Sequence, residues 1–302
     1  MIDRAGIAAV CVAVSLWPQL VLAQGHRGAP PGQLKKPASS NTPAEAPDVA
    51  VVPTDSPRVR SFGMWLDDAT LAAARSVWLT TGVTRWSSPV ASGTELPSVN
   101  AAVGLTPRMQ ASFSVSHSRA WLSGLGDEVT SGVGNTYAGV KLLLVDRTYH
   151  DIGISAAPTL EILSTGSTAD GSSRVNMILP VSFELGRGAT RAYGSAGYFT
   201  RGATFASVAI ERHLSPVVAV TGAIMQSWST ADADDAAVYG LSRRRTDIAG
   251  GVTAFVSPRV GVYASIGRTI SAMDFDSARY VFATGVAVGF QVPPGILPRP
   301  PK

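Results

Sequence analysis

Hydrophobic and polar positions alternate along most of this chain, from about residue 76 to residue 290. The stretch 279–291, RYVFATGVAVGFQ, shows the pattern clearly. One set of alternate positions is large, with aromatic residues at both ends, and the other set is mostly Ala and Gly. Because successive side chains of a β-strand point to opposite faces, the pattern predicts a strand with one bulky apolar face and one small face.

Twelve segments of this kind predict an all-β fold. Pro158 and Pro180 count against two of them, because proline removes a hydrogen-bond donor from a sheet, but the alternation runs through both. The predicted strands are 76–87, 96–105, 108–118, 136–146, 150–163, 174–186, 189–199, 203–213, 217–229, 245–256, 259–269 and 279–290.

The connections between these strands alternate in length. Five are short, namely 105–109, 145–151, 185–189, 213–217 and 256–260. The intervening links are mostly longer, namely 88–95, 119–135, 164–173, 230–244 and 270–278, with a tight exception at 200–202. Short turns at one end and long loops at the other are typical of membrane β-barrels. An even number of strands places both barrel termini at the short-turn end.

The N-terminal region is typical of an exported protein. Arg4, the apolar stretch 5–16 and VLA at 21–23 predict a signal peptide over residues 1–23. The chain's one cysteine, Cys11, lies inside it, so disulfide chemistry is not expected after cleavage. Residues 24–60 contain seven prolines and no aromatic residue, which predicts a disordered linker.

Residues 61–75 separate this linker from the first strand. Asp67 or Asp68 is placed to cap a short helix that runs to about Arg75. We expect a short amphipathic segment that packs at the rim of the fold. A plug or a partner-docking element is the alternative interpretation.

Composition favours a membrane barrel. Charged residues make up 15% of the chain, below the roughly 25% of a typical soluble domain. No run of about 18 apolar residues follows the N-terminus, so a transmembrane helix is not predicted. The expected fold is a single antiparallel transmembrane β-barrel of about 12 strands over residues 76–290, with the bulky faces toward lipid and the small faces toward the interior.

These features together resemble bacterial outer-membrane β-barrel proteins over about residues 74–290. The run Trp65-Leu-Asp-Asp and the barrel size are also similar to the outer-membrane transporters of phenol-degradation pathways. The resemblance implies an outer-membrane location, contact with lipid and lipopolysaccharide, and insertion by the barrel-assembly machinery. Such barrels usually end at the terminal aromatic, whereas here a Pro-rich tail, 291–302, follows Phe290, which puts efficient insertion in question.

Six charged residues fall on the inward face by this alternation. They either line a channel for the passive passage of small solutes, with apolar solutes among the candidates, or pair and fill the lumen of a structural or surface-interaction barrel. Twelve strands lie between the sizes that side chains fill and those that leave an open channel. A turn at 187–188 would place Glu184 opposite Arg191. The candidate lumen-lining residues are Lys141, Glu161, Glu184, Arg191, Glu211 and Asp247.

Other chemistry receives little support. An outer-membrane lipid hydrolase needs a His and a Ser on one face, but the neighbours His117 and Ser118 point to opposite faces. His150 and His213 fall in short turns, and 230–245 lacks the Gly and Glu of a calcium loop, so no metal or cofactor is expected. The sequence pI is about 9.4, yet no basic stripe with interleaved aromatics predicts nucleic-acid binding.

Overall fold

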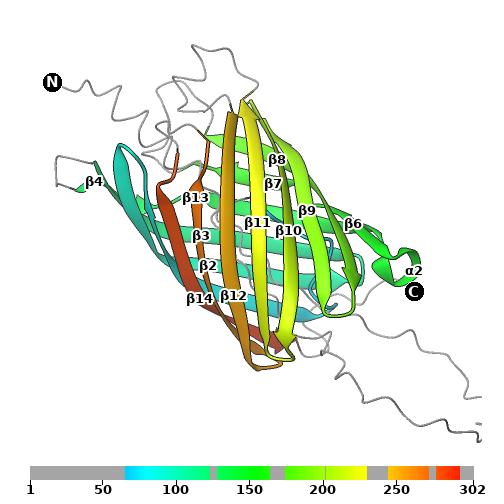
Figure 1. Ribbon diagram of the computed structural model, residues 1–302. Helices are drawn as coiled ribbons and strands as arrows, with labels where there is room; N and C mark the ends of the chain where they lie inside the picture. The colour runs from blue at the N-terminus through cyan, green and yellow to red at the C-terminus, as the bar shows by residue number, and fades with distance from the viewer. Residues whose placement is uncertain are drawn as a thin grey trace, which may run out of the picture.

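The computed structural model describes residues 65–122, 128–163, 174–200, 202–229, 244–271 and 277–292. They form a closed antiparallel barrel of twelve strands (Figure 1). The signal peptide and linker predicted for 1–60, and the tail from 293 onward, lie outside the described residues.

The barrel wall contains fourteen strand segments. β4 and β5 both pair with β3, and β6 and β7 both lie between β5 and β8, so each couple forms one barrel strand. β1 pairs with β14 along its whole length and closes the barrel. The segments are β1 (Ser76–Ser87), β2 (Ala91–Thr106), β3 (Met109–Leu122), β4 (Glu128–Val133), β5 (Thr136–Val145), β6 (Ile152–Ala156), β7 (Thr159–Ile162), β8 (Val175–Arg187), β9 (Thr190–Phe199), β10 (Ala203–Ser215), β11 (Val218–Ser229), β12 (Arg244–Ser257), β13 (Val260–Thr269) and β14 (Tyr280–Gln291).

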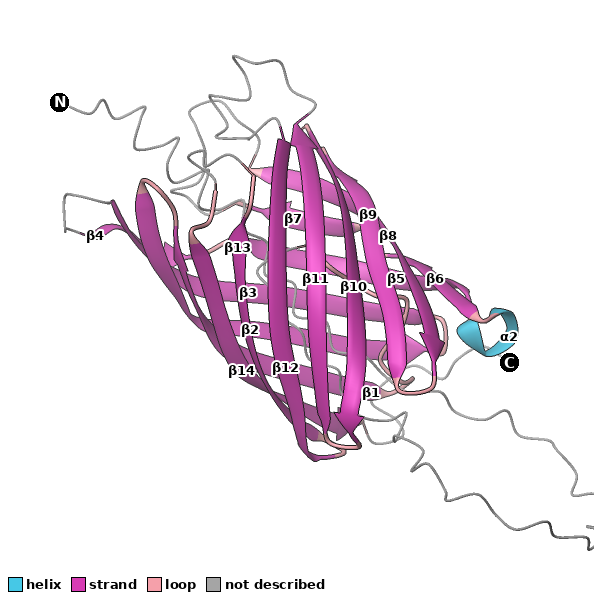
Figure 2. Ribbon diagram, in the orientation of Figure 1, coloured by secondary structure: helices cyan, strands magenta, loops and turns pink. Residues whose placement is uncertain are grey.

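The strands depart from the predicted segments at several places. β3 continues to Leu122 and β4 covers Glu128–Val133, so both occupy part of the long link expected at 119–135. β2 begins at Ala91, so the long link expected at 88–95 is reduced to 88–90. The segment predicted at 150–163 is divided between β6 and β7, and Pro158, which has no N–H to donate, lies in the gap. The connection before β6 contains α2 (Arg147–His150), the one helix among the described residues (Figure 2).

The outer surface of the barrel is apolar and the inner face of β14 is small, as predicted. Tyr280, Phe282 and Phe290 are 41–49% exposed, whereas Ala283 and Ala287 are fully buried. Other strands present the same apolar surface, with exposed Leu79, Phe113, Leu144, Leu179, Val181, Ile210, Val252 and Ile266. No helix among the described residues is long and apolar enough to cross a membrane.

Residues 65–75, here named the luminal segment, lie inside the barrel. The short helix predicted for 61–75 is not formed by these residues, which have no helical assignment. Trp65 packs against Phe199, the last residue of β9 at the long-loop end. At the other end of the segment, the Arg75 N–H donates to the carbonyl of Gly104, close to the short turn that follows β2. The segment therefore crosses much of the height of the lumen before it enters β1.

Candidate functional site

An aromatic cluster holds the first residue of the luminal segment. The Trp65 ring lies 5.3 Å from the Phe199 ring and 6.0 Å from the Phe205 ring, centroid to centroid. The Tyr137 ring is 5.8 Å away, and its hydroxyl donates to Glu161 Oε1 at 3.1 Å. Buried aromatic rings at tilted and edge-on angles attract beyond their area of contact, so this cluster anchors the segment near the long-loop end.

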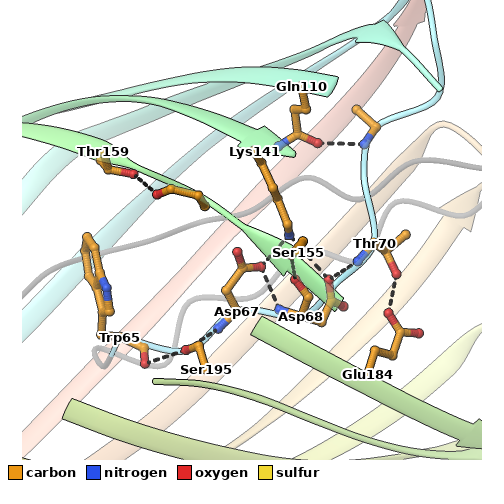
Figure 3. Close-up of polar contacts among 12 residues, drawn as sticks. Trp65, Asp67, Asp68, Thr70, Gln110, Lys141, Ser155, Thr159, Glu184 and Ser195 are labelled. Carbon is orange, nitrogen blue, oxygen red and sulfur yellow. Dashed lines mark hydrogen bonds and ion pairs between the residues drawn. The ribbon is translucent and has the colours of Figure 1, made fainter. Parts of the chain in front are cut away.

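Two adjacent carboxylates follow in the segment and meet a buried lysine. Lys141 Nζ lies 2.7 Å from Asp67 Oδ1 and 3.7 Å from Asp68 Oδ1 (Figure 3). All three residues are buried. Among the described residues, these two carboxylates are the ion-pair partners of Lys141, so this lysine on the wall is neutralised by the segment.

Arg191 of β9 forms the centre of a second group of charges. Its Nη2 lies 2.9 Å from Asp68 Oδ2, its Nη1 lies 3.0 Å from Glu184 Oε1, and its Nε lies 2.8 Å from Glu211 Oε1. The hydroxyl of Thr70 donates to Glu184 Oε2. The guanidinium therefore connects one carboxylate of the segment to two carboxylates of the wall, and all of these acids are buried.

The backbone of the segment is satisfied by inward polar side chains. The hydroxyl of Ser195 accepts from the Asp67 N–H at 3.3 Å and donates to the Trp65 carbonyl at 3.4 Å. Gln110 Oε1 accepts from the Ala72 N–H at 2.6 Å. Because buried peptide groups need partners, these wall residues fix the path of the segment as well as its side chains.

Small wall residues leave room for the segment to pass. A Cβ placed on Gly104 would lie 1.9 Å from the Ala73 carbonyl oxygen, and one on Gly153 would lie 3.0 Å from the Ala69 Cβ. A larger residue at Gly104 would therefore collide with the segment backbone. Beside the Lys141–Asp67 pair, a cavity of about 20 Å³ remains, enough for roughly one water molecule.

Burial in the lumen alters the chemistry of Asp67, which lies before β1 and outside the strands. Loss of hydration raises the pKa of its carboxyl to about 6, the Lys141 ammonium acts in the opposite direction, and the Asp68 charge raises it further. At neutral pH the carboxyl is ionised, as its 2.7 Å contact with Lys141 requires.

All six charged residues predicted to face inward are at most 5% exposed, namely Lys141, Glu161, Glu184, Arg191, Glu211 and Asp247. Four of them meet around the luminal segment, and Glu161 holds Tyr137 of the aromatic cluster. Asp247 lies apart, where it accepts from Arg245 Nε at 3.0 Å and from the Thr269 hydroxyl at 2.6 Å.

The predicted turn is wrong by one residue, which shifts the predicted hairpin register by two residues. The turn between β8 and β9 falls at 188–189, not 187–188, and it places Gly186 rather than Glu184 opposite Arg191. The 3.0 Å contact between Glu184 and Arg191 is therefore diagonal across the two strands. A positive φ of 58° at Gly188 accommodates the turn.

The sequence predicts that His150 and His213 lie in short turns and that His117 and Ser118 point to opposite faces. His213 does not lie in a turn, because β10 continues to Ser215, and its Nε2 is 3.5 Å from Glu211 Oε1. His117 and Ser118 are consecutive residues of β3, so they point to opposite faces.

The acidic and basic stretch at 230–243 lies outside the described residues. Within the part of the chain that is described, no three His, Cys, Asp or Glu side chains gather as a metal site would require.

The sequence did not predict that residues of the luminal segment contact the inward charged residues of the barrel wall. The sequence predicts a short helix packed at the rim, with a plug only as the alternative, and it assigns no wall contact to Trp65, Asp67 or Asp68. Gln110 and Ser195 fall on the inward face by alternation, and nothing in the sequence marks either as a partner of the segment.

No family model matches the chain, and neither does any curated protein sequence. Among solved structures, the chain is similar to the NanC porin, with 9% identity over 70% of this chain and 98% of that one, and a TM-score of 0.48. It is also similar to LpxR from Salmonella typhimurium, with 8% identity over 70% and 99% of the two chains and a TM-score of 0.46. The KdgM porin in complex with disordered oligogalacturonate gives 9% identity over 71% and 99%, and a TM-score of 0.44. Likenesses this distant assign no solute or reaction to the chain.

Proposed function

We propose that this protein is an outer-membrane channel for small solutes, closed by its own luminal segment in the conformation described here. The apolar outer surface supports a place in lipid, because charged residues on a lipid-facing surface are costly and these strands present large apolar side chains instead. Aromatic residues at both ends of the outward face of β14 fit the two membrane interfaces. Contacts with lipopolysaccharide and the assembly machinery stay predictions.

The observation that carries the channel proposal is that charged residues of the wall contact the segment. Interiors of outer-membrane barrels are polar both in open channels and in plugged barrels, so the deciding feature is which groups the wall charges contact. Here the wall contributes Lys141, Glu184, Arg191 and Glu211, and two of these are directly bridged by carboxylates of a segment that belongs to no strand. Such a wall fits a lumen that is hydrated whenever the segment leaves.

The second candidate is a structural or surface-interaction barrel whose lumen stays filled. The same contacts favour it, because the segment brings an aromatic anchor, two ion-pair sites and several backbone hydrogen bonds into the lumen. The two candidates differ in whether the segment ever leaves. Passage of apolar solutes has no specific support in this charged lumen.

Single-channel recording of the refolded full chain in a planar bilayer tests the proposal. We compare the native sequence with the double variant Asp67→Asn/Asp68→Asn, which keeps the shape of both side chains. Because it removes both carboxylates, Lys141 is left buried without an ion-pair partner whenever the segment is docked, which disfavours docking. Brief, infrequent conductance steps are expected from the native chain and long-lived steps from the double variant. If neither sequence conducts although both barrels are folded, the filled-lumen candidate replaces the channel.

A further inference from the structure

Lys141 differs from the other charged residues of the lumen in the origin of its partners. Arg191 keeps two wall carboxylates, Glu184 and Glu211, whether or not the segment is present. Within the described part of the chain, the ion pairs of Lys141 are made with Asp67 and Asp68. Departure of the segment would leave the lysine as a cation on the wall with its ion-pair partners removed.

The described residues of the barrel wall supply no carboxylate ion-pair partner to Lys141. Among the described residues, Glu184 lies within ion-pair distance of Arg147 and Arg191, and Glu211 within that distance of Arg191, while the inward Glu161 accepts a hydrogen bond from Tyr137. None of these three carboxylates forms a described ion pair with Lys141, whose partners are Asp67 and Asp68. When the segment leaves, the Lys141 ammonium faces the hydrated lumen without a carboxylate beside it, and the low-dielectric barrel wall focuses its field, which attracts anions to this position.

Neutral donors stand next to this lysine. Gln110 is the cross-strand neighbour of Lys141, on the same inward face, and it is fully buried. Its Oε1 accepts from the segment, while its Nε2 has no hydrogen-bond partner among the described residues. The hydroxyl of Ser195 lines the small cavity beside the lysine. A buried amide N–H without an acceptor is unfavourable, so a ligand that supplies an acceptor oxygen is favoured at this position.

The present occupant of this position shows which chemistry fits. Asp67 supplies a carboxylate at 2.7 Å from Lys141, and Trp65, two residues earlier, supplies an aromatic ring to the pocket formed by Tyr137, Phe199 and Phe205. Trp65 and Lys141 line the same cavity. The segment therefore presents a carboxylate and a flat apolar group together, at neighbouring places on the wall.

We propose that Lys141, with Gln110 and Ser195, forms a binding site for small organic carboxylates, and that the luminal segment occupies this site as a built-in competitor. A solute that carries a carboxylate and a flat apolar group replaces the Asp67 carboxylate on Lys141 and the Trp65 ring in the aromatic pocket. The segment then leaves the lumen. This inference rests on the proposed channel for its physiological meaning, but the binding site itself is tested separately.

Thiol labelling measures departure of the segment without any conductance. Cys11 is the one cysteine of the chain, so Cys11→Ser with Leu66→Cys gives a full-length protein with a single thiol in the segment, at a position that is buried when the segment is docked. The protein is refolded into lipid vesicles and treated with a neutral maleimide. We compare benzoate with benzamide, which has the same ring and no charge, and with sodium chloride at matched ionic strength.

Benzoate is expected to accelerate labelling by about fivefold or more. Fivefold is the lower end of the typical coupling between two ligands, which here are benzoate and the luminal segment. Benzamide and chloride are expected to leave the rate unchanged. Lys141→Gln removes the response to benzoate, and Lys141→Arg, which keeps the charge, retains it. Equal rates with benzoate and benzamide, or an undiminished benzoate response in Lys141→Gln, overturns the proposal.

The labelling result and the conductance result separate the two proposals. A benzoate response in a barrel that never conducts retains the carboxylate site and removes the channel. Conductance that appears in Asp67→Asn/Asp68→Asn, together with no benzoate response in the labelling experiment, retains the channel and removes the carboxylate site.

Discussion

The guanidinium of Arg191 lies 2.9 Å from the carboxylate of Asp68 and so joins β9 to the segment that precedes β1. Asp68→Asn removes this charge while Arg191 keeps Glu184 and Glu211. Because hydrogen bonds to charged groups contribute about 1.5–3 kcal/mol, we expect docking of the luminal segment to weaken by that order. Labelling of Leu66→Cys should accelerate by roughly tenfold or more, since 1.4 kcal/mol is a factor of ten.

A matched control for this substitution is Asp151→Asn. Asp151 is exposed at the C-terminal end of α2 and has a φ of 58°, a conformation that Asn tolerates well. It changes the net charge by the same amount without touching the segment. If Asp151→Asn accelerates labelling as much as Asp68→Asn does, the effect arises from overall charge and not from the Arg191 contact.

Trp65→Ala should release the end of the segment near the long loops. The indole is almost fully buried among three aromatic rings, and replacing a buried Trp with Ala typically costs about 3–5 kcal/mol. We expect faster labelling of Leu66→Cys and little change in barrel unfolding. Trp228→Ala, at a site 39% exposed on β11, is the control and should leave labelling unchanged.

Gly104→Ala should displace the other end of the segment. The added Cβ would lie 1.9 Å from the Ala73 carbonyl oxygen, and overpacking of this kind costs about 1–3 kcal/mol. A thiol at Ala72→Cys, a buried position, should become accessible at the short-turn mouth. Gly222→Ala, where a Cβ has open space around it, is expected to fold and label like the parent. Unchanged protection in Gly104→Ala would contradict the placement of the segment against β2.

Closure of the channel should depend on pH through Asp67. Its pKa is raised from 3.8 to about 6 in the docked segment. Between these values the docked state binds more protons than the undocked state, so docking strengthens as pH falls from 6 toward 4 and weakens as pH rises through 6. The open fraction in single-channel records should therefore fall on acidification across this window.

Asp67→Asn isolates that contribution. The variant cannot titrate at this position, so the part of the pH response that belongs to Asp67 should disappear, while responses from other carboxylates persist. An identical pH dependence in the native chain and in Asp67→Asn would mean that burial does not perturb this carboxyl.

The strands and the inward charges could be predicted because both follow from one physical demand. Lipid outside and polar contents inside require opposite residue types at consecutive positions, and that alternation is visible in β8 and β14. The parity of the pattern then placed Lys141, Arg191 and Glu211 inward. A hairpin turn shifted by one residue does not disturb this parity within a strand, so the error at 187–188 left Arg191 on the correct face.

The luminal segment could not be predicted in the same way, because it has no period-two pattern. Its two aspartates followed by an Ala-rich run indicate a helix on local grounds. In the structure, the Ala72 and Asp67 N–H groups donate to Gln110 and Ser195 instead of to the segment itself. Tertiary partners thus override local propensity, and those partners are far away in the sequence.

The luminal segment continues directly into β1, and the Ser76 N–H donates to the Ala73 carbonyl at 2.9 Å where the two meet. A carboxylate from solution therefore competes with the Asp67 carboxylate, which is covalently attached to the barrel and cannot diffuse away. Tethering by a short linker gives an effective concentration on the order of millimolar. The barrel would therefore open above a threshold concentration of the solute. It would stay closed while the solute concentration is below the effective concentration of the tethered Asp67 carboxylate and open once the two are comparable.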